Sequence, residues 1–407
     1  MKIGLITKEE KYWGTRDFSK NTIDLLKKEF KASHLRLTDK TNTSKIQDLY
    51  KKSDIVINLS TKSINYNRRF LKPTIFFAYA WMDHGAGINL YCNRRFFLPN
   101  DILVFASKPA QKKYKYIYRN GLKSFVIPFY TGVEKVKLSS KETSKLKNKY
   151  QIPENKKILV YFGRLSSEKN IDLILHFTKK LGGDFLLLLI GKTNEFFTYG
   201  FPAVDEKQYH KNLNAQVKKN KLANTIIIEK IDRDDLIKIL SISFLSINLT
   251  TCYEENFGIS TIESMAIGLP VIGTDWGGLK DTLRSGTGLA LKTKIKDNFH
   301  ITVDSMGAVE FVDNLSVNQA LYKQMIKKCQ SRANRYYSEK AFLQNLIKII
   351  NQVHMKEMKS SRTELLLPRT WVRKIYDFSL RKNQVHRIYE KNPALFKKLY
   401  KFYASEL

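Results

Sequence analysis

The stretch Cys252-Tyr-Glu-Glu-Asn-Phe-Gly-Ile-Ser-Thr-Ile-Glu-Ser-Met-Ala-Ile-Gly-Leu-Pro-Val-Ile-Gly-Thr-Asp-Trp-Gly-Gly278 carries most of the information on the fold. It follows an apolar run, residues 244–249, that predicts a buried strand, and its middle, residues 262–267, predicts a helix. Gly258 lets the backbone before that helix approach a ligand closely, and Gly268 ends the helix. Strand, loop and helix in this order predict an α/β unit with a ligand at the loop.

Short apolar runs alternate with amphipathic stretches along the rest of the chain, which is typical of parallel α/β sheets. In the first half we expect a helix over residues 22–30 and strands over residues 2–7, 53–60, 73–80, 102–107 and 124–128. In the second half we expect a helix over residues 173–181 and strands over residues 158–162, 185–190, 225–229 and 244–249. Two consecutive series predict two Rossmann-like domains.

The charge of the chain points to an anionic partner. The 407 residues include 71 Lys and Arg against 38 Asp and Glu, a formal net charge of +33. Nucleic acid, an anionic membrane surface and phosphorylated small substrates all fit this charge, as do solvated surface lysines without any partner. A nucleic-acid partner is disfavoured because the sequence has no zinc-finger, RRM or other such signature.

The cysteines and the apolar runs indicate in which compartment the protein is found. Three cysteines, Cys92, Cys252 and Cys329, are far apart and lack metal-ligand spacing, which argues against a disulfide framework or a zinc site. The N-terminus lacks the apolar stretch of a signal peptide, and no apolar run approaches the roughly 20 residues that span a bilayer. We therefore expect a cytoplasmic protein, with peripheral attachment to the inner face of the plasma membrane as an option.

Two carboxylates frame the start of the helix in the opening stretch. Glu255 precedes it in the loop and Glu263 lies in its second turn, so they can meet different parts of one ligand. Carboxylate oxygens accept hydrogen bonds from hydroxyls, which ribose and hexose rings offer in pairs, and the amides of a helix start suit a phosphate. The stretch therefore fits a sugar nucleotide. The plain alternative is two surface glutamates around an ordinary helix start.

This stretch closely resembles the signature of the family 4 glycosyltransferases, the glycosyl transferases group 1. That signature has two glutamates separated by seven residues and enclosing a Phe-Gly pair, and Glu255, Phe257, Gly258 and Glu263 match it. The resemblance spans Lys157 to Gly288. It implies an α/β fold of the GT-B class, two Rossmann-like domains facing each other across a cleft, with a C-terminal helical extension.

A second motif supports the resemblance. Residues 162–170, Phe-Gly-Arg-Leu-Ser-Ser-Glu-Lys-Asn, are similar to the first strand-loop-helix unit of the family's nucleotide-binding domain. Gly163 allows a tight turn, and Arg164 and Lys169 offer positive charge to a diphosphate. Gly191, after the strand at 185–190, is a further match. Without its neighbour this motif would indicate no more than a helix-capping loop.

The first half matches the family less well, as expected of an acceptor-binding domain. Gly14, within Tyr12–Thr15, stands where the family often has a loop with two glycines, and only one is present. His84, followed by Gly85, resembles the family's His-Gly element near the reacting sugar. The alternative is a histidine satisfied by backbone hydrogen bonds.

The resemblance implies a retaining glycosyltransferase that moves a sugar from a UDP- or GDP-sugar to a hydroxyl acceptor, in bacterial polysaccharide or glycolipid biosynthesis. It implies catalytic roles for His84, Arg164, Lys169 and Glu255. It implies donor binding by Gly14, Gly163, Arg164, Lys169, Gly191, Glu255, Asn256, Phe257, Gly258, Ile259 and Glu263. Glu255 would hold the sugar and Glu263 the ribose. Neither a metal nor a cofactor is expected.

The resemblance also implies a division of the chain. We expect an acceptor-binding domain over residues 1–134, a nucleotide-sugar-binding domain over 135–335, a helix over 336–358 that returns to the first domain, and a basic, aromatic tail over 359–407. The tail suits either a membrane interface, which would imply a lipid-linked acceptor, or a helix packed on the first domain. A nucleic-acid-binding protein and a noncatalytic sugar-nucleotide-binding module remain the alternatives to an enzyme.

Overall fold

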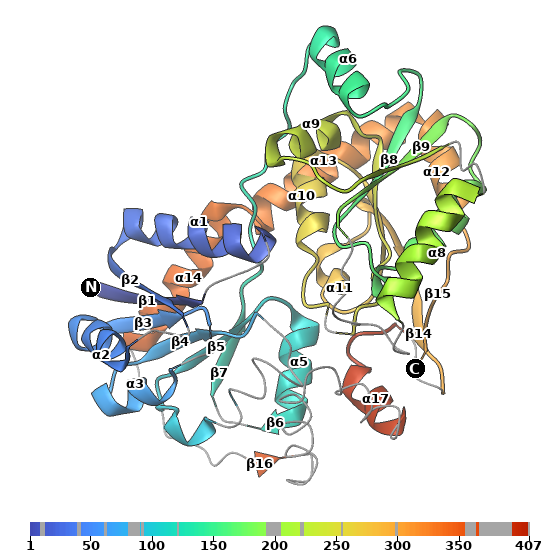
Figure 1. The fold of residues 1–407 in the computed structure, drawn as a ribbon. Coiled ribbons are helices and arrows are strands. Elements are labelled where there is room, and N and C mark those ends of the chain that lie inside the picture. The colour runs from blue at the N-terminus through green and yellow to red at the C-terminus, as the bar shows by residue number, and fades with distance from the viewer. Residues whose placement is uncertain are drawn as a thin grey trace. The chain divides into compact units, whose positions relative to one another are not determined.

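The computed structural model describes residues 1–8, 13–38, 42–60, 63–79, 90, 93–119, 122–192, 205–219, 224–253, 255–297, 300–354, 364–365 and 393–405. The chain divides into two compact units (Figure 1). The first comprises Met1–Tyr130 and Glu339–Val385, and the second Thr131–Ser338 and His386–Leu407. Each unit holds a six-stranded sheet, so the predicted pair of Rossmann-like domains is present.

The first unit is built on a parallel sheet with the strand order β2-β1-β3-β4-β5-β7. The strands are β1 (Lys2–Lys8), β2 (Lys31–Leu37), β3 (Ile55–Asn58), β4 (Thr74–Phe77), β5 (Ile102–Phe105) and β7 (Lys123–Val126). The helices are α1 (Trp13–Glu29), α2 (Thr43–Lys52), α3 (Asn65–Phe70), η1 (Arg94–Phe96), α5 (Lys108–Ile117) and α14 (Glu339–His354). A short antiparallel pair joins β6 (Tyr118–Arg119) to β16 (Glu364–Leu365).

The second unit is built on a parallel sheet with the strand order β10-β9-β8-β11-β12-β13. The strands are β8 (Lys157–Phe162), β9 (Phe185–Ile190), β10 (Thr225–Ile228), β11 (Leu245–Asn248), β12 (Val271–Thr274) and β13 (Gly288–Leu291). Numbered within the unit, this order is the 3-2-1-4-5-6 arrangement of a Rossmann fold. The direction of winding reverses between β8 and β11, the place where such sheets bind ligands.

Helices cover this sheet (Figure 1), and an antiparallel pair, β14 (Thr293–Ile295) with β15 (Ile301–Val303), follows it. The helices are α6 (Ser140–Lys149), η2 (Ser167–Lys169), α7 (Ile171–Lys179), α8 (Glu206–Lys219), α9 (Arg233–Ile242), α10 (Ile259–Ile267), α11 (Leu279–Thr282), α12 (Ala308–Val317), α13 (Gln319–Tyr336) and α17 (Pro393–Tyr400).

The apolar strands of the second unit are buried on both faces. On β8, Leu159 and Tyr161 join one hydrophobic cluster with α7 and α12, whereas Ile158, Val160 and Phe162 join another with α9. Successive side chains of a strand point to opposite faces, so a continuous apolar run is what a sheet with helices on both sides requires. The rigid sheet holds the loops at its carboxyl edge in fixed positions.

The helix expected over residues 336–358 spans Glu339–His354, α14, and belongs to the first unit. There the ring of Phe342 lies 5.7 Å from that of Phe18 and 4.7 Å from that of Tyr130. The expected tail divides between the two units. Its residues 364–365 pair with β6 of the first unit, whereas its residues 393–405 belong to the second unit, where their aromatic side chains are buried against a loop.

Candidate donor site in the second unit

The two sequence motifs meet at the reversal point of the second sheet. β8 and β11 are hydrogen-bonded neighbours, and the motif loops leave their carboxyl ends at Gly163 and Leu249. Backbone and side-chain bonds join the loops: the amide of Thr251 donates to the carbonyl of Glu168 over 2.9 Å, and Asn170 Nδ2 donates to the carbonyl of Leu249 over 2.6 Å. The two segments therefore form one structure.

Two glycines shape the carboxyl edge beside these loops. Gly163 and Gly191 follow β8 and β9, both with a φ of +152°. A Cβ on Gly191 would lie 1.7 Å from the carbonyl oxygen of Gly163, far inside van der Waals contact. Position 191 therefore admits only glycine, and its backbone fits directly against the loop after β8.

A largely buried ion pair connects the motifs. Lys169 Nζ lies 2.8 Å from Glu255 Oε2 and 3.0 Å from Thr250 Oγ1. The side chains of Lys169 and Glu255 are 15% and 13% exposed. The sequence assigned the lysine to the phosphates and the glutamate to the sugar, and the structure brings the two groups into contact.

Burial and attraction compete in setting the charge of this pair. Burial raises the pKa of Glu255, but the charge and hydrogen bond of Lys169, together with Arg164 and the Phe257 amide, outweigh it, so that the pKa lies below its ordinary value. Burial lowers the pKa of Lys169, but the Glu255 carboxylate and the other acidic groups around it together outweigh burial, so that the pKa lies above its ordinary value. Burial raises the pKa of the nearby Cys252 thiol to about 12. Lys169 and Glu255 are therefore both charged at neutral pH, and Cys252 is a neutral thiol.

Arg164 lies at the rim of the same loop. Its Nη2 is 3.0 Å from Oε1 of Glu168, whose side chain is fully buried, while 30% of the Arg164 side chain is exposed. The Tyr161 hydroxyl donates to the carbonyl of Arg164 over 2.5 Å. The guanidinium is thus held at a fixed place and still reaches solvent, as a group that binds a charged ligand must.

The helix α10 begins at the loop that contains Glu255. Gly258 precedes its first residue, Ile259, in a left-handed conformation, φ +85°, and as a glycine it makes no side-chain hydrogen bond to the first turn. A Cβ on Gly258 would lie 2.4 Å from Leu279 Cδ2, so glycine is required by space as well as by φ. The amides of this first turn form the kind of helix terminus that binds phosphate.

Glu263, four residues into α10, is paired with a residue that the sequence analysis did not identify. The guanidinium of Arg233, the first residue of α9, contacts the Glu263 carboxylate with Nη2 against Oε1, and its Nη1 lies 3.5 Å from Oε2. Glu263 is 8% exposed. No pattern in the sequence links Arg233 with a residue thirty positions later.

Asn256 and Phe257 occupy the loop between Glu255 and Gly258. The Phe257 ring is 2% exposed and packs edge-on against Tyr337, with 5.7 Å between the ring centroids. Phe257 is thus an anchor of the loop, and contact with a donor at this position would come from its backbone. Asn256 is partly exposed, and its Oδ1 lies 3.4 Å from the Tyr403 hydroxyl.

Of the residues expected in the first half, His84 lies outside the described residues. Gly14 belongs to the first unit, and it lies in the first turn of α1 rather than in a loop, because α1 already begins at Trp13.

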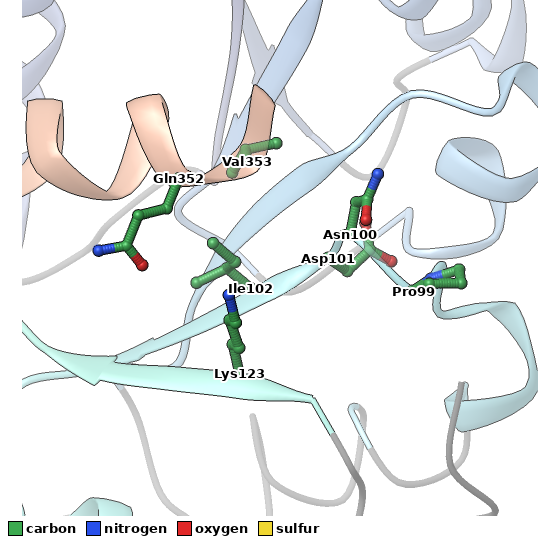
Figure 2. Close-up of a pocket in the computed structure, with 7 residues that line it drawn as sticks. All are labelled: Pro99, Asn100, Asp101, Ile102, Lys123, Gln352 and Val353. Atoms are coloured by element: carbon green, nitrogen blue, oxygen red, sulfur yellow. The ribbon is translucent and has the colours of Figure 1, made fainter. Parts of the chain in front are cut away.

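A small pocket in the first unit is not part of this site. Figure 2 shows it at the amino ends of the strands β5 and β7, lined by Pro99, Asn100, Asp101, Ile102, Lys123, Gln352 and Val353. Ligands of parallel sheets bind at the opposite, carboxyl edge. Asp101 there accepts hydrogen bonds from the amides of Leu98 and Thr74 over 2.6 and 2.9 Å, and burial raises its pKa. Its role is to hold loops together.

Within the described ranges, no three His, Cys, Asp or Glu side chains gather as a metal ion would require. None of the helices described there is long and apolar enough to cross a bilayer.

The second unit matches a known protein family. Residues 142–324 match the model of the glycosyl transferases group 1. A curated relative, the N-acetyl-alpha-D-glucosaminyl L-malate synthase of Bacillus anthracis, is 28% identical over 159 residues, which are 39% of this chain and 37% of the relative. The match thus spans little more than a third of that relative's length.

Solved structures share the fold of nearly the whole chain. HepE of Anabaena, in complex with UDP and glucose, matches with a TM-score of 0.65 and 15% identity over 86% of this chain and 100% of its own. A glycosyltransferase of Rickettsia africae matches with a TM-score of 0.66 and 17% identity over 88% of this chain and 99% of its own. Sucrose-phosphate synthase of Thermosynechococcus elongatus matches with a TM-score of 0.61 and 14% identity over 86% and 98%. The fold is GT-B.

Proposed function

We propose, on the premise that residues 142–324 form a glycosyl transferases group 1 domain, that this protein is a retaining glycosyltransferase. It takes a sugar from a nucleoside-diphosphate sugar bound at the reversal point of the second sheet and transfers it to a hydroxyl acceptor. The observation that carries the proposal is the buried Lys169–Glu255 pair, with 2.8 Å between Nζ and Oε2, beside the uncapped start of α10.

The groups at this edge match the parts of such a donor. A diphosphate fits the amides of α10 together with Arg164 and Lys169, since helix termini and fixed cations favour oxyanions. Hydroxyls of the sugar fit the carboxylate of Glu255, and those of the ribose fit Glu263, because carboxylates accept hydrogen bonds from paired hydroxyls. Arg233 fixes the orientation of the Glu263 carboxylate. UDP is the first nucleotide to test, since HepE was solved with UDP and with UDP-glucose.

The chemistry needs stabilisation of the leaving group. The bond between the anomeric carbon and the β-phosphate oxygen breaks, and negative charge grows on the phosphate, where prearranged cations and amides lower the barrier. In a retaining transfer the acceptor oxygen attacks from the same face, and its proton passes to the departing phosphate. This route requires no carboxylate base and no metal. His84 would lie at the sugar, near the acceptor.

The acceptor and the place of action follow from the charge. A net charge of +33 attracts the protein to anionic surfaces, so a lipid-linked acceptor at the inner face of a bacterial plasma membrane, in glycan or glycolipid synthesis, is the acceptor class we propose. The protein would work from the cytoplasm as a peripheral enzyme. Adding vesicles with and without anionic lipid to the assay below tests this part separately.

A donor screen tests the proposal. Purified protein is mixed with UDP-, GDP- and ADP-sugars in EDTA, and donor hydrolysis and thermal shift are followed. We expect one donor class to raise the melting temperature and to be hydrolysed slowly, and Glu263→Ala to abolish both effects. Glu310→Ala, which alters an exposed glutamate of α12, is the matched control and should behave like the wild type. No response to any donor, together with salt-sensitive retention on DNA, would replace the proposal by a nucleic-acid role.

A further inference from the structure

The C-terminal segment 393–405 is an integral part of the second unit. Phe396, Leu399, Tyr400 and Tyr403 are each 0% exposed, which is the burial of core residues and not of an appendage. Tyr400 stacks on Phe396 with 4.3 Å between centroids. The segment follows α14 in the chain, and α14 belongs to the first unit, so the chain returns to the second unit at its end.

The aromatic side chains of this segment press on Trp276. The Tyr400 ring lies parallel to the indole at 6.1 Å and 8°, and the Tyr403 ring meets it at 5.7 Å and 62°. Trp276 is itself fully buried, and its Nε1 donates to the carbonyl of Cys252 over 2.6 Å. The segment therefore supports the beginning of the loop that carries Glu255.

Two glycines lie between Tyr403 and the donor loop. The amide of Gly277 donates to the carbonyl of Tyr403 over 3.0 Å, and the amide of Gly278 donates to the carbonyl of Glu255 over 2.8 Å. A Cβ on Gly277 would lie 2.3 Å from the Glu255 carbonyl oxygen and 2.8 Å from Tyr403 Cδ1. The Gly277–Gly278 turn is thus packed between Tyr403 on one side and the backbone of Glu255 and Asn256 on the other, with no space for a side chain.

A direct contact and three anchors complete the arrangement. The Tyr403 hydroxyl lies 3.4 Å from Asn256 Oδ1. Lys280 Nζ donates to the carbonyl of Ala404 over 2.6 Å, and Ser405 bonds both the amide and the carbonyl of Thr293 over 2.9 Å. The end of the segment is therefore fixed to the same unit, and Tyr403 is held from both sides.

From this arrangement we propose that residues 393–405 position the donor-binding loop, and that Tyr403 is the positioning residue. Tyr403 acts through Asn256 and the Gly277–Gly278 turn on the Glu255 backbone, without touching the substrate itself. The inference rests on the proposed function, because the loop must bind a donor for its position to matter. Loosening the segment should then impair donor use more than acceptor use, since small displacements of binding groups reduce rates strongly.

Three full-length variants test the inference. Tyr403→Leu removes the ring that contacts Trp276 and Gly277, and Tyr403→Phe keeps the ring and removes only the hydroxyl. Lys398→Ala, which alters an exposed residue of α17, is the control. We expect Tyr403→Leu to reduce kcat/KM for the donor between about tenfold and a hundredfold, with the KM for the acceptor unchanged. Tyr403→Phe should restore most of the loss, and Lys398→Ala should match the wild type.

A measurement on the wild type keeps the test valid if Tyr403→Leu does not fold. Binding linkage is reciprocal, so the nucleoside diphosphate that the wild type releases should slow hydrogen exchange at the Gly277 amide and over residues 400–404. An unchanged exchange there, or a folded Tyr403→Leu with wild-type donor kinetics, would overturn the inference. Failure of the wild type to use any nucleotide sugar would instead refute the proposed function, so the two failures are distinct.

Discussion

Lys169 Nζ lies 2.8 Å from Glu255 Oε2, and this contact joins the loop after β8 to the loop after β11. Both side chains are largely but not fully buried, with 15% and 13% exposed. A pair of this kind costs desolvation energy that mutual attraction repays only in good geometry. The pair therefore holds two opposite charges in contact at the place where we propose that a charged donor binds.

Removing one partner of this pair should destabilise the protein strongly. Lys169→Met leaves the Glu255 carboxylate buried without its cation, and Glu255→Gln leaves the ammonium group without its anion, so each should lower the free energy of unfolding by about 3–5 kcal/mol. The double variant should lose less than the sum of the two. Urea unfolding measures all three. Lys397→Met, at the exposed pair with Asp297, is the matched control and should change little, and additive losses in the double variant would contradict the expected coupling.

The stability that this pair contributes should not depend on pH near neutrality. The pKa of Glu255 is lowered, so its contribution is complete above the ordinary value of 4.5 and is lost as the pH falls through the lower, folded-state value. The pKa of Lys169 is raised, so its contribution is complete below 10.5 and is lost as the pH rises through the higher, folded-state value. The difference in unfolding free energy between the wild type and the double variant should therefore stay constant between pH 4.5 and pH 10.5. A step near neutral pH would show that another group titrates with the pair.

Arg233 should contribute to nucleotide affinity although it is not expected to touch the diphosphate. Without it, Glu263 loses the guanidinium that orients its carboxylate, and Arg233→Ala should weaken nucleotide binding about tenfold, the equivalent of about 1.4 kcal/mol. Calorimetric titration with the nucleotide measures this. Arg284→Ala is the matched control, since Arg284 pairs with Asp281 at the surface with 3.6 Å between Nη2 and Oδ1. Equal losses in both variants would indicate a general effect of charge instead.

The sequence predicted the second sheet well because its strands are buried on both faces. The apolar runs 158–162 and 185–190 correspond to Lys157–Phe162 and Phe185–Ile190, with ends that differ by at most one residue. It missed β2, Lys31–Leu37, because this strand lies at the edge of its sheet and its exposed and partly buried residues do not alternate strictly along its length. Periodicity is weak in such a strand.

The candidate site could be predicted only as far as local motifs reach. Glu255 and Gly258 were found because a loop followed by a helix start can be recognised from the consecutive residues 255–263. Arg233 and Tyr403 were not found, because they meet Glu263 and Asn256 across 30 and 147 positions of the chain. The tail in particular showed a helical pattern of aromatic residues, which predicts a buried face but does not name the surface that covers it.

Two glycines that flank β9 should respond very differently to the same substitution. Gly191→Ala places a Cβ 1.7 Å from the Gly163 carbonyl oxygen at a φ of +152°, so it must displace the loop that carries Arg164 and Lys169. We expect a loss of more than about 1 kcal/mol in unfolding free energy and a weaker affinity for the nucleotide. Gly183→Ala, just before the strand, meets nothing within 4 Å and should change stability by less than about 0.5 kcal/mol. Urea unfolding and calorimetric titration of both variants measure the two effects. If Gly191→Ala were as stable as the wild type and bound the nucleotide with full affinity, the loop after β8 would adapt freely, and its close contact with Gly191 would not determine the geometry of the donor site.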